Sequence, residues 1–383
     1  MLRFILSITL SLIFSGLFGQ DTTYVHVNTG VNVQNEDIKS IIELWKNYIH
    51  SNPDGLQSSP YWNEEEKAAF KNFDFLSFEF GRQWYNRPYY KSTILSIDPV
   101  DEYYQIKTLF AYVLDTGNIE VLCSMNVYAK KVNERFKLYN SLPIYTRDWQ
   151  QQMTRNIQYH FPASHVFNPA LADSMNVFID DLKTKFKIDT TYAITFYFAD
   201  DWDVIQQAKG LDYYAGMGNI PKSQGRQNGL NKMVFSGAGD EWYPHELVHI
   251  YLYPEFPKGG FFHEGIASFL GGHAGKPLEW HYKRMDTYLS KHQEINLDSL
   301  MDFYYMDNIT NPKHVISGLL CQMALELGGM DKLKHLLTYG ESHQSNSFNE
   351  NAYNAIESVL DIKQEELNET IRQELKKRAR IAD

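Results

Sequence analysis

A five-residue motif near the middle of the chain, residues 245–249, reads H-E-x-x-H within an apolar segment. On an α-helix, residues four apart lie on one face, so His245 and His249 point their imidazoles the same way. Two imidazoles placed like this suit two positions around a tetrahedral zinc ion. Glu246 follows the first histidine directly, where its carboxylate can reach a metal-bound water rather than the metal. The motif therefore predicts a helix with a Zn²⁺ site and Glu246 as a base.

A candidate third ligand lies downstream, in the apolar segment Phe261–Phe269. Glu264 is followed by Gly265 and, two positions further, by Ala267, which gives an E-G-x-A pattern. Most helical glutamates are solvated surface charges, but this apolar setting is a poor place for one. Two imidazoles and one carboxylate would leave one zinc position open, as catalytic zinc sites do.

H-E-x-x-H followed by E-G-x-A resembles the gluzincin zinc metallopeptidases, the thermolysin-like superfamily. This resemblance implies that His245, His249 and Glu264 bind zinc. It also implies that a zinc-bound water activated by Glu246 hydrolyses peptide bonds in a peptide or protein substrate. The metzincin pattern is excluded, because its downstream Gly and His positions hold other residues here.

The resemblance further implies a hydrogen-bond donor for the oxyanion of amide hydrolysis, taken from a Tyr or His of the C-terminal helices. The segment His314–Leu319 resembles the small-residue helix that supplies this donor. His314 is therefore the catalytic candidate, with Tyr304 and Tyr305 as alternatives. The position equally suits an ordinary surface histidine at a helix start after Pro312.

Some family features are missing from the sequence. Certain gluzincins place an Asp four residues after the ligand glutamate, where this chain has Ser268. Aminopeptidase relatives bind the substrate amine with the glutamate of a G-A-M-E-N strand, whereas residues 215–219 read A-G-M-G-N. This difference puts aminopeptidase activity in doubt. His263 and His273 lie near the motifs and are predicted to be hydrogen-bonding residues rather than ligands.

The N-terminus predicts export. Residues 1–19 resemble a secretory signal peptide, because Arg3 precedes an apolar stretch too short to span a bilayer. We expect a periplasmic or extracellular protein with no membrane insertion after signal cleavage. Cys123 and Cys321 are the only cysteines and suit core positions rather than a disulfide framework. The net charge of −11, without a basic patch, gives no sign of nucleic-acid binding, and the oligomeric state stays open.

Hydrophobic periodicity predicts an α+β fold with two domains, residues 20–150 and 151–383. The first domain should have helices followed by a curved antiparallel sheet, an order that resembles the cystatin-like cone. Its expected elements are helices at 38–53 and 63–73 and strands at 104–112, 119–131 and 135–140.

The second domain should begin with a helix, a strand, a second helix and a glycine-rich loop, followed by a strand before the zinc helices. That order resembles the first lobe of a gluzincin, and the chain after about Leu278 should be helical. The expected ranges are 168–186, 193–198, 202–209, 216–229 and 232–235, then helices at 299–303, 314–327 and 331–338. Gluzincins use the strand before the zinc helix as a substrate-binding edge, and Asp240 and Glu241 are expected to serve the N-terminus of that helix.

Two other functions stay open. The chain can be a catalytically silent gluzincin relative that acts as a binding or assembly module. It can also be a zinc hydrolase of a non-peptide bond. The intact Glu246 favours the peptidase, because a silent site has no chemical need for this carboxylate.

Overall fold

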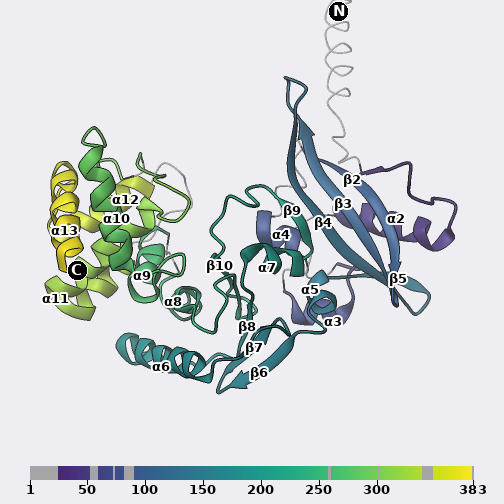
Figure 1. The fold of residues 1–383 in the computed structure, drawn as a ribbon, viewed down its shortest axis with the longest axis horizontal. Coiled ribbons are helices and arrows are strands. Elements are labelled where there is room, and N and C mark those ends of the chain that lie inside the picture. Colours follow the sequence, from purple (N-terminus) through teal and green to yellow (C-terminus); the bar gives the residue numbers. More distant parts are fainter. Residues whose placement is uncertain are drawn as a thin grey trace, which may run out of the picture. The chain divides into compact units, whose positions relative to one another are not determined.

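A computed structural model describes residues 25–51, 59–71, 74–81, 90–257, 260–300, 302–338 and 348–381, so the predicted signal peptide lies outside the described residues. The chain forms two compact units (Figure 1). Unit 1 comprises residues 1–144 and 209–215, and unit 2 comprises residues 145–208 and 216–383. Each unit contains a mixed sheet and helices, which confirms the α+β class. Unlike the predicted domains 20–150 and 151–383, the units are not continuous in sequence.

Unit 1 contains a six-stranded sheet in the order β1-β2-β3-β4-β5, with β9 also paired to β4. Only β1 and β2 run parallel. The strands are β1 (Val25–Val27), β2 (Lys91–Val100), β3 (Tyr103–Val113), β4 (Ile119–Val132), β5 (Arg135–Tyr139) and β9 (Leu211–Tyr214). The predicted hairpin is confirmed as β3 and β4. Strand β2 was not predicted, because a register shift between Ile94 and Ser96 interrupts its alternation.

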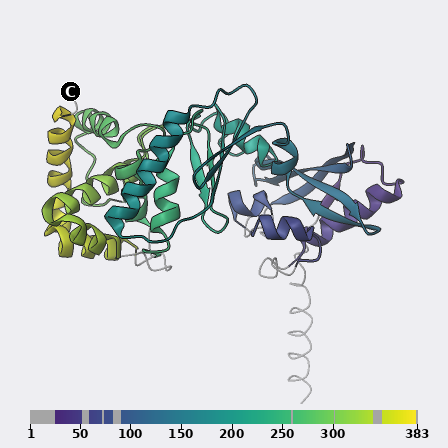
Figure 2. The same ribbon diagram turned by 90° about the horizontal axis from the view of Figure 1, so that it is seen from below.

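Four helices accompany this sheet: α2 (Glu36–Ile49), α3 (Glu64–Ala69), α4 (Phe75–Phe80) and, at the boundary with unit 2, α5 (Ser141–Tyr145). The predicted first helix is confirmed as α2, which packs on the sheet (Figure 2). The side chain of Asn35 caps α2 by accepting hydrogen bonds from the backbone amides of Asp37 and Ile38. The predicted apolar face is buried, and it includes Ile41, Trp45 and Ile49.

A buried carboxylate in α3 should make unit 1 sensitive to pH. The backbone amide and Nδ2 of Asn140 donate to Oε2 of Glu66 at 3.0 and 2.7 Å. Burial nevertheless raises the pKa of Glu66 from 4.5 to about 7. The folded state then binds a proton that the unfolded state releases between these two pH values. Stability must therefore fall as the pH rises from about 4.5 to about 7.

We predict that Glu66→Gln removes this loss, because glutamine keeps an acceptor oxygen for Asn140 without a charge. The effect should reach roughly 2–3 kcal/mol at neutral pH. The measurement is the urea-unfolding free energy of unit 1 at pH 5 and pH 7.5 in the full chain. The control is Glu65→Gln, which changes an exposed neighbour on the same helix. Equal pH slopes for Glu66→Gln and wild type would contradict the prediction.

Unit 2 contains a five-stranded sheet in the order β10-β11-β8-β7-β6. Its three inner strands run parallel, and the two edge strands are antiparallel to their neighbours. The strands are β6 (Gln150–Thr154), β7 (Ile157–Phe161), β8 (Ile194–Phe198), β10 (Gly225–Asn228) and β11 (Met233–Ser236). Tyr159, Phe196 and Val234 form one cross-strand row and belong to the core that the helices cover.

The helices of unit 2 follow the predicted order with one exception. They are α6 (Pro169–Phe186), α7 (Trp202–Ala208), α8 (Pro244–Leu252), α9 (Phe261–Gly271), α10 (Leu278–Lys291), α11 (Pro312–Thr338), α12 (Phe348–Leu360) and α13 (Leu367–Ile381). Non-helical backbone at Gly328 and Gly329 interrupts α11, which confirms two helical segments there. The predicted helix at 299–303 is wrong for the described residues, which form turns. The glycine-rich loop was also wrong in part, since it contains β10.

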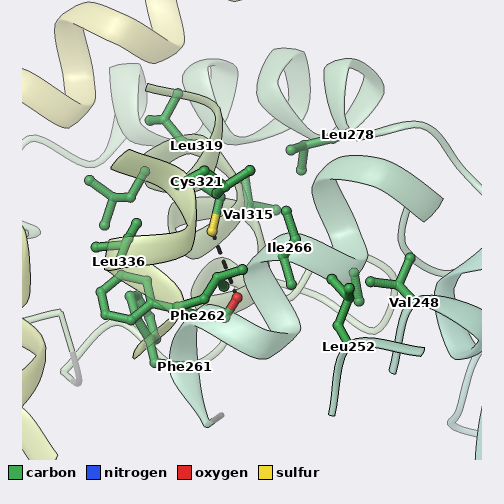
Figure 3. Close-up of a cluster of buried hydrophobic side chains, with 14 of the residues drawn as sticks. Val248, Leu252, Phe261, Phe262, Ile266, Leu278, Val315, Leu319, Cys321 and Leu336 are labelled. Carbon is green, nitrogen blue, oxygen red and sulfur yellow. Dashed lines mark hydrogen bonds between the residues drawn. The ribbon is translucent and has the colours of Figure 1, made fainter. Parts of the chain in front are cut away.

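Helices α9 and α11 pack closely in the unit 2 core. Figure 3 shows Phe262 and Ile266 of α9 among Val315 and Leu319 of α11. The Sγ atom of Cys321 donates to the Phe262 carbonyl at 3.7 Å. Both cysteines are buried and free, in agreement with the predicted core positions. Among the described residues, no helix has the length and apolarity required to cross a membrane.

Candidate metal centre

Helix α8 carries the H-E-x-x-H motif, and every residue in it is buried. Pro244 occupies the first turn, where its missing N–H costs nothing. The expected capping by Asp240 and Glu241 is wrong, because Tyr243 is the N-cap residue and no side chain caps the helix. The Asp240 carboxylate accepts a hydrogen bond from the Trp242 amide. The Glu241 carboxylate accepts one from the Asn168 amide and makes another with Nε2 of His165.

Glycines allow α9 to approach its neighbours. A Cβ atom on Gly271 would lie 2.5 Å from the backbone nitrogen of His245, at the start of α8. A Cβ atom on Gly265 would lie 2.6 Å from the carbonyl oxygen of Ser317 in α11. The Ser317 hydroxyl in turn donates to the Phe261 carbonyl. The small-residue approach expected from the E-G-x-A pattern is thus present at Gly265.

The structure brings the three predicted ligands together. Nε2 of His245 lies 3.5 Å from Oε2 of Glu264, and Nε2 of His249 lies 3.6 Å from the same oxygen. The three ligand atoms lie within 4.8 Å of one another. Ligands of a tetrahedral zinc ion are about 3.3 Å apart, given bonds of roughly 2.0–2.1 Å. The donor types and their spacing therefore fit Zn²⁺.

A backbone carbonyl orients the first ligand. Nδ1 of His245 donates to the Gly272 carbonyl at 2.6 Å, so Nε2 is the nitrogen that faces Glu264 and would bind a metal ion. Metal-bound histidines usually make a contact of this kind with their second nitrogen. Ser268 does not replace the missing Asp, because its buried hydroxyl has no hydrogen-bond partner in the described part of the chain.

The two buried histidines and the partly exposed Glu264 carboxylate lie close enough for their charges to stabilise one another. Burial alone would lower the pKa of His245, but the hydrogen bond with Glu264 outweighs it and raises the pKa to about 9. The contacts with His245 and His249 hold the pKa of Glu264 well below its usual value despite its burial. A cation suits this pocket, and Zn²⁺ would compete with protons for it.

Glu246 lies outside the ligand group, as expected for a base rather than a ligand. Its side chain is buried with the rest of α8, and this burial raises its pKa. A raised pKa brings a carboxylate closer to the pH at which it can both accept and release a proton.

His314 lies beside the cluster. Its Nδ1 is 3.7 Å from Oε2 of Glu264 and 3.2 Å from Nδ1 of His273. The rings of His314 and His245 are nearly parallel, at 11°. The group of three mutually close ligand atoms comes from His245, His249 and Glu264, and His314 lies beside it. The alternatives Tyr304 and Tyr305 are 68% and 61% exposed, which favours His314.

Of two further buried histidines, one contacts the predicted ligand His249 and the other contacts His273. His263 donates its Nε2 proton to the Phe256 carbonyl at 2.6 Å, and its ring stacks near His249. His281 is fully buried and was not singled out by sequence, although it contacts the backbone of His273. The sequence offered no signal for His281, because this contact joins α10 to the turn after α9. Burial lowers the pKa of His263 to about 4.

Comparisons with protein-family models and with curated proteins found no match to this chain. The resemblance to gluzincins rests on the two sequence motifs.

Proposed function

We propose that this protein is an exported zinc-dependent metallopeptidase of the gluzincin type. The observation that carries the proposal is the convergence of His245, His249 and Glu264 from two helices onto one small volume. The signal-like sequence at residues 1–19 supports export. Unit 1 would then be an accessory domain, and its helices and mostly antiparallel sheet support the predicted resemblance to a cystatin-like cone.

When bound, zinc would polarise the scissile carbonyl and make a water more acidic. The chain supplies the proton transfers. Glu246 would accept the proton of the attacking water at its carboxylate and then deliver it to the leaving amine. His314 would donate an N–H to the oxyanion that forms on the substrate carbonyl.

Strand β10 supports a peptide as the substrate. It is one of the two edge strands of the unit 2 sheet and, among the strands that the structure describes, pairs with β11 alone. The substrate-binding edge strand was predicted at 232–235. This is wrong, because those residues belong to β11, which lies between β10 and β8. Helix α8 contacts β10, and the Tyr243 ring occupies the space beside Gly225. An extended peptide paired to the free side of an edge strand receives main-chain hydrogen bonds without regard to its sequence.

We predict that the purified mature chain binds one zinc ion and that His249→Ala abolishes this binding. Removing one of three protein ligands leaves too few donors for a stable site. The measurement is metal content after dialysis against a weak chelator, together with hydrolysis of a mixed peptide library. The control is His160→Ala, which changes a histidine of β7 that stacks on Tyr197. A wild-type chain that takes up no zinc at neutral pH would refute the proposal.

A further inference from the structure

We propose that Arg284 and Thr310 are positioning residues of the zinc site, because a hydrogen-bond network joins them to the turn whose carbonyl orients the ligand His245. This inference rests on the proposed function and deepens it, since it names groups that act behind a metal ligand. Arg284 lies in α10 and Thr310 lies just before α11, so both are outside the two sequence motifs.

The Arg284 side chain is held by three contacts. Its Nε donates to Oγ1 of Thr310 at 3.1 Å, and its Nη2 forms an ion pair with the Asp307 carboxylate. The guanidinium also lies over the Trp280 ring, 4.8 Å from the ring centroid. Oδ1 of Asp307 accepts hydrogen bonds from the backbone amides of Ile309 and Thr310, both at 2.8 Å. Arg284 therefore fixes both the backbone and the hydroxyl of Thr310.

The direction of the hydrogen bonds follows from Arg284. A guanidinium has donors and no acceptor, so the Thr310 hydroxyl must accept from Nε. Its own hydrogen then serves Nδ1 of His281, which lies 3.1 Å away. Burial lowers the pKa of His281, so its imidazole is neutral and its one proton is on Nε2, which donates to the His273 carbonyl at 2.8 Å. Each hydrogen in this network is used once, and the Thr310 and His281 side chains are fully buried, so each group needs its partner.

The network ends on the turn after α9. The His273 carbonyl also accepts from the Lys276 amide at 2.9 Å, and the His273 amide donates to the Lys276 carbonyl at 2.8 Å. Between these residues, Ala274 and Gly275 have φ values of 48° and 71°, which is left-handed backbone. Such backbone is costly for alanine and persists where the surroundings determine it. The hydrogen bond from His281 is one such contact from outside the turn.

The peptide group between Gly272 and His273 connects this turn to the metal ligand. Its N–H is the His273 amide that binds the Lys276 carbonyl, and its C=O is the Gly272 carbonyl that accepts from Nδ1 of His245 at 2.6 Å. A displaced turn would move this acceptor and rotate the His245 ring. Nε2 of that ring, now 3.5 Å from Oε2 of Glu264, would then leave the position that suits a shared metal ion.

The test measures metal binding by the full mature chain. Thr310→Val removes the hydroxyl and keeps the shape of the side chain, whereas Thr310→Ser keeps the hydroxyl. Competition with a chromogenic chelator gives the Kd for zinc. We expect Thr310→Val to raise this Kd about 10-fold, the low end for groups behind a metal ligand, and Thr310→Ser to stay within about 2-fold of wild type. The absorption spectrum of the Co²⁺-loaded proteins reports the ligand geometry and should change in Thr310→Val alone.

The matched control is Arg372→Met, which removes another arginine that binds backbone carbonyls. From α13, Arg372 donates to the carbonyls of Leu289, His292 and Ile295 at 2.9, 3.3 and 2.7 Å, at the opposite end of α10 from the turn. Arg372→Met should lower the urea-unfolding free energy but keep the wild-type zinc Kd and cobalt spectrum. A purely structural role of the network would not separate these readouts.

A second substitution tests the other member of the network. Arg284→Met should weaken zinc binding as Thr310→Val does, and the double variant should bind zinc no more weakly than either single variant, because both changes break one network. The Arg284 side chain is 37% exposed, so Arg284→Met keeps the inference testable if Thr310→Val fails to fold.

Three results would overturn the inference: a wild-type zinc Kd in Thr310→Val, a wild-type Kd in Arg284→Met, or an equal loss of zinc affinity in Arg372→Met. These measurements need no substrate. A wild type that binds zinc but cleaves no peptide would therefore refute the proposed function and leave the inference standing. A wild type that binds neither metal ion would refute both.

Discussion

Replacing Glu246 by glutamine should lower peptide hydrolysis by about 10²- to 10⁴-fold, the usual cost of losing a general base. Glutamine keeps the size of the side chain in a fully buried helix but cannot take a proton at neutral pH. The ligand nitrogens of His245 and His249 and the carboxylate of Glu264 are untouched, so zinc content should remain at one. The measurement is turnover on a peptide library with metal content determined on the same samples.

The matched control is Glu255→Gln, which makes the same chemical change at an exposed position shortly after α8. It should retain wild-type turnover. If Glu246→Gln were as active as wild type, Glu246 would have no part in the mechanism. If neither wild type nor Glu246→Gln hydrolysed peptides while both bound zinc, the result would favour a binding module or a hydrolase of a non-peptide bond.

Local patterns were enough for part of the fold. Amphipathic periodicity identified α2 and α6, and alternation over 104–112 identified β3, because these elements present one face to a core. Strand β2 was not predicted, because its bulge changes which set of alternate residues is buried halfway along the strand. Strand β9 was not predicted because only its pairing with the distant strand β4 defines it, and β10 was not predicted because its four residues show no apolar alternation.

In the candidate site, too, some contacts could be predicted from the sequence and others could not. The i, i+4 geometry of His245 and His249 is a property of one helix, so the sequence alone could predict it. Glu264 required the family pattern, because its approach to α8 depends on how two helices pack. The hydrogen bonds of His273 and His281 join a turn to two neighbouring helices, and no sequence spacing encodes contacts of that kind.

The segment that returns to unit 1 is fixed by a buried ion pair. Nζ of Lys209 lies 2.5 Å from Oε1 of Glu79, and the two side chains are 0% and 5% exposed. Next to it, Gly210 has a φ of 101° and lies so close to Asn126 that a Cβ atom would be 2.5 Å from its carbonyl oxygen. Strand β9 follows directly and pairs with β4. This ion pair therefore stabilises the contact through which residues 209–215 join unit 1.

Replacing Lys209 by methionine should destabilise unit 1 by about 3–5 kcal/mol, because it leaves the Glu79 carboxylate buried without its cation. Combining Lys209→Met with Glu79→Leu should recover most of this loss, since two apolar side chains need no compensating charge. The control is Lys39→Met, which breaks an exposed ion pair with Glu36 and should cost less than about 1 kcal/mol. Hydrogen exchange followed by mass spectrometry localises the effect: amides of β4 and β9 should exchange faster, while those of β8 and β11 in unit 2 keep their protection. A Lys209→Met protein with wild-type exchange in β4 and β9 would show that the pair contributes little to the stability of unit 1.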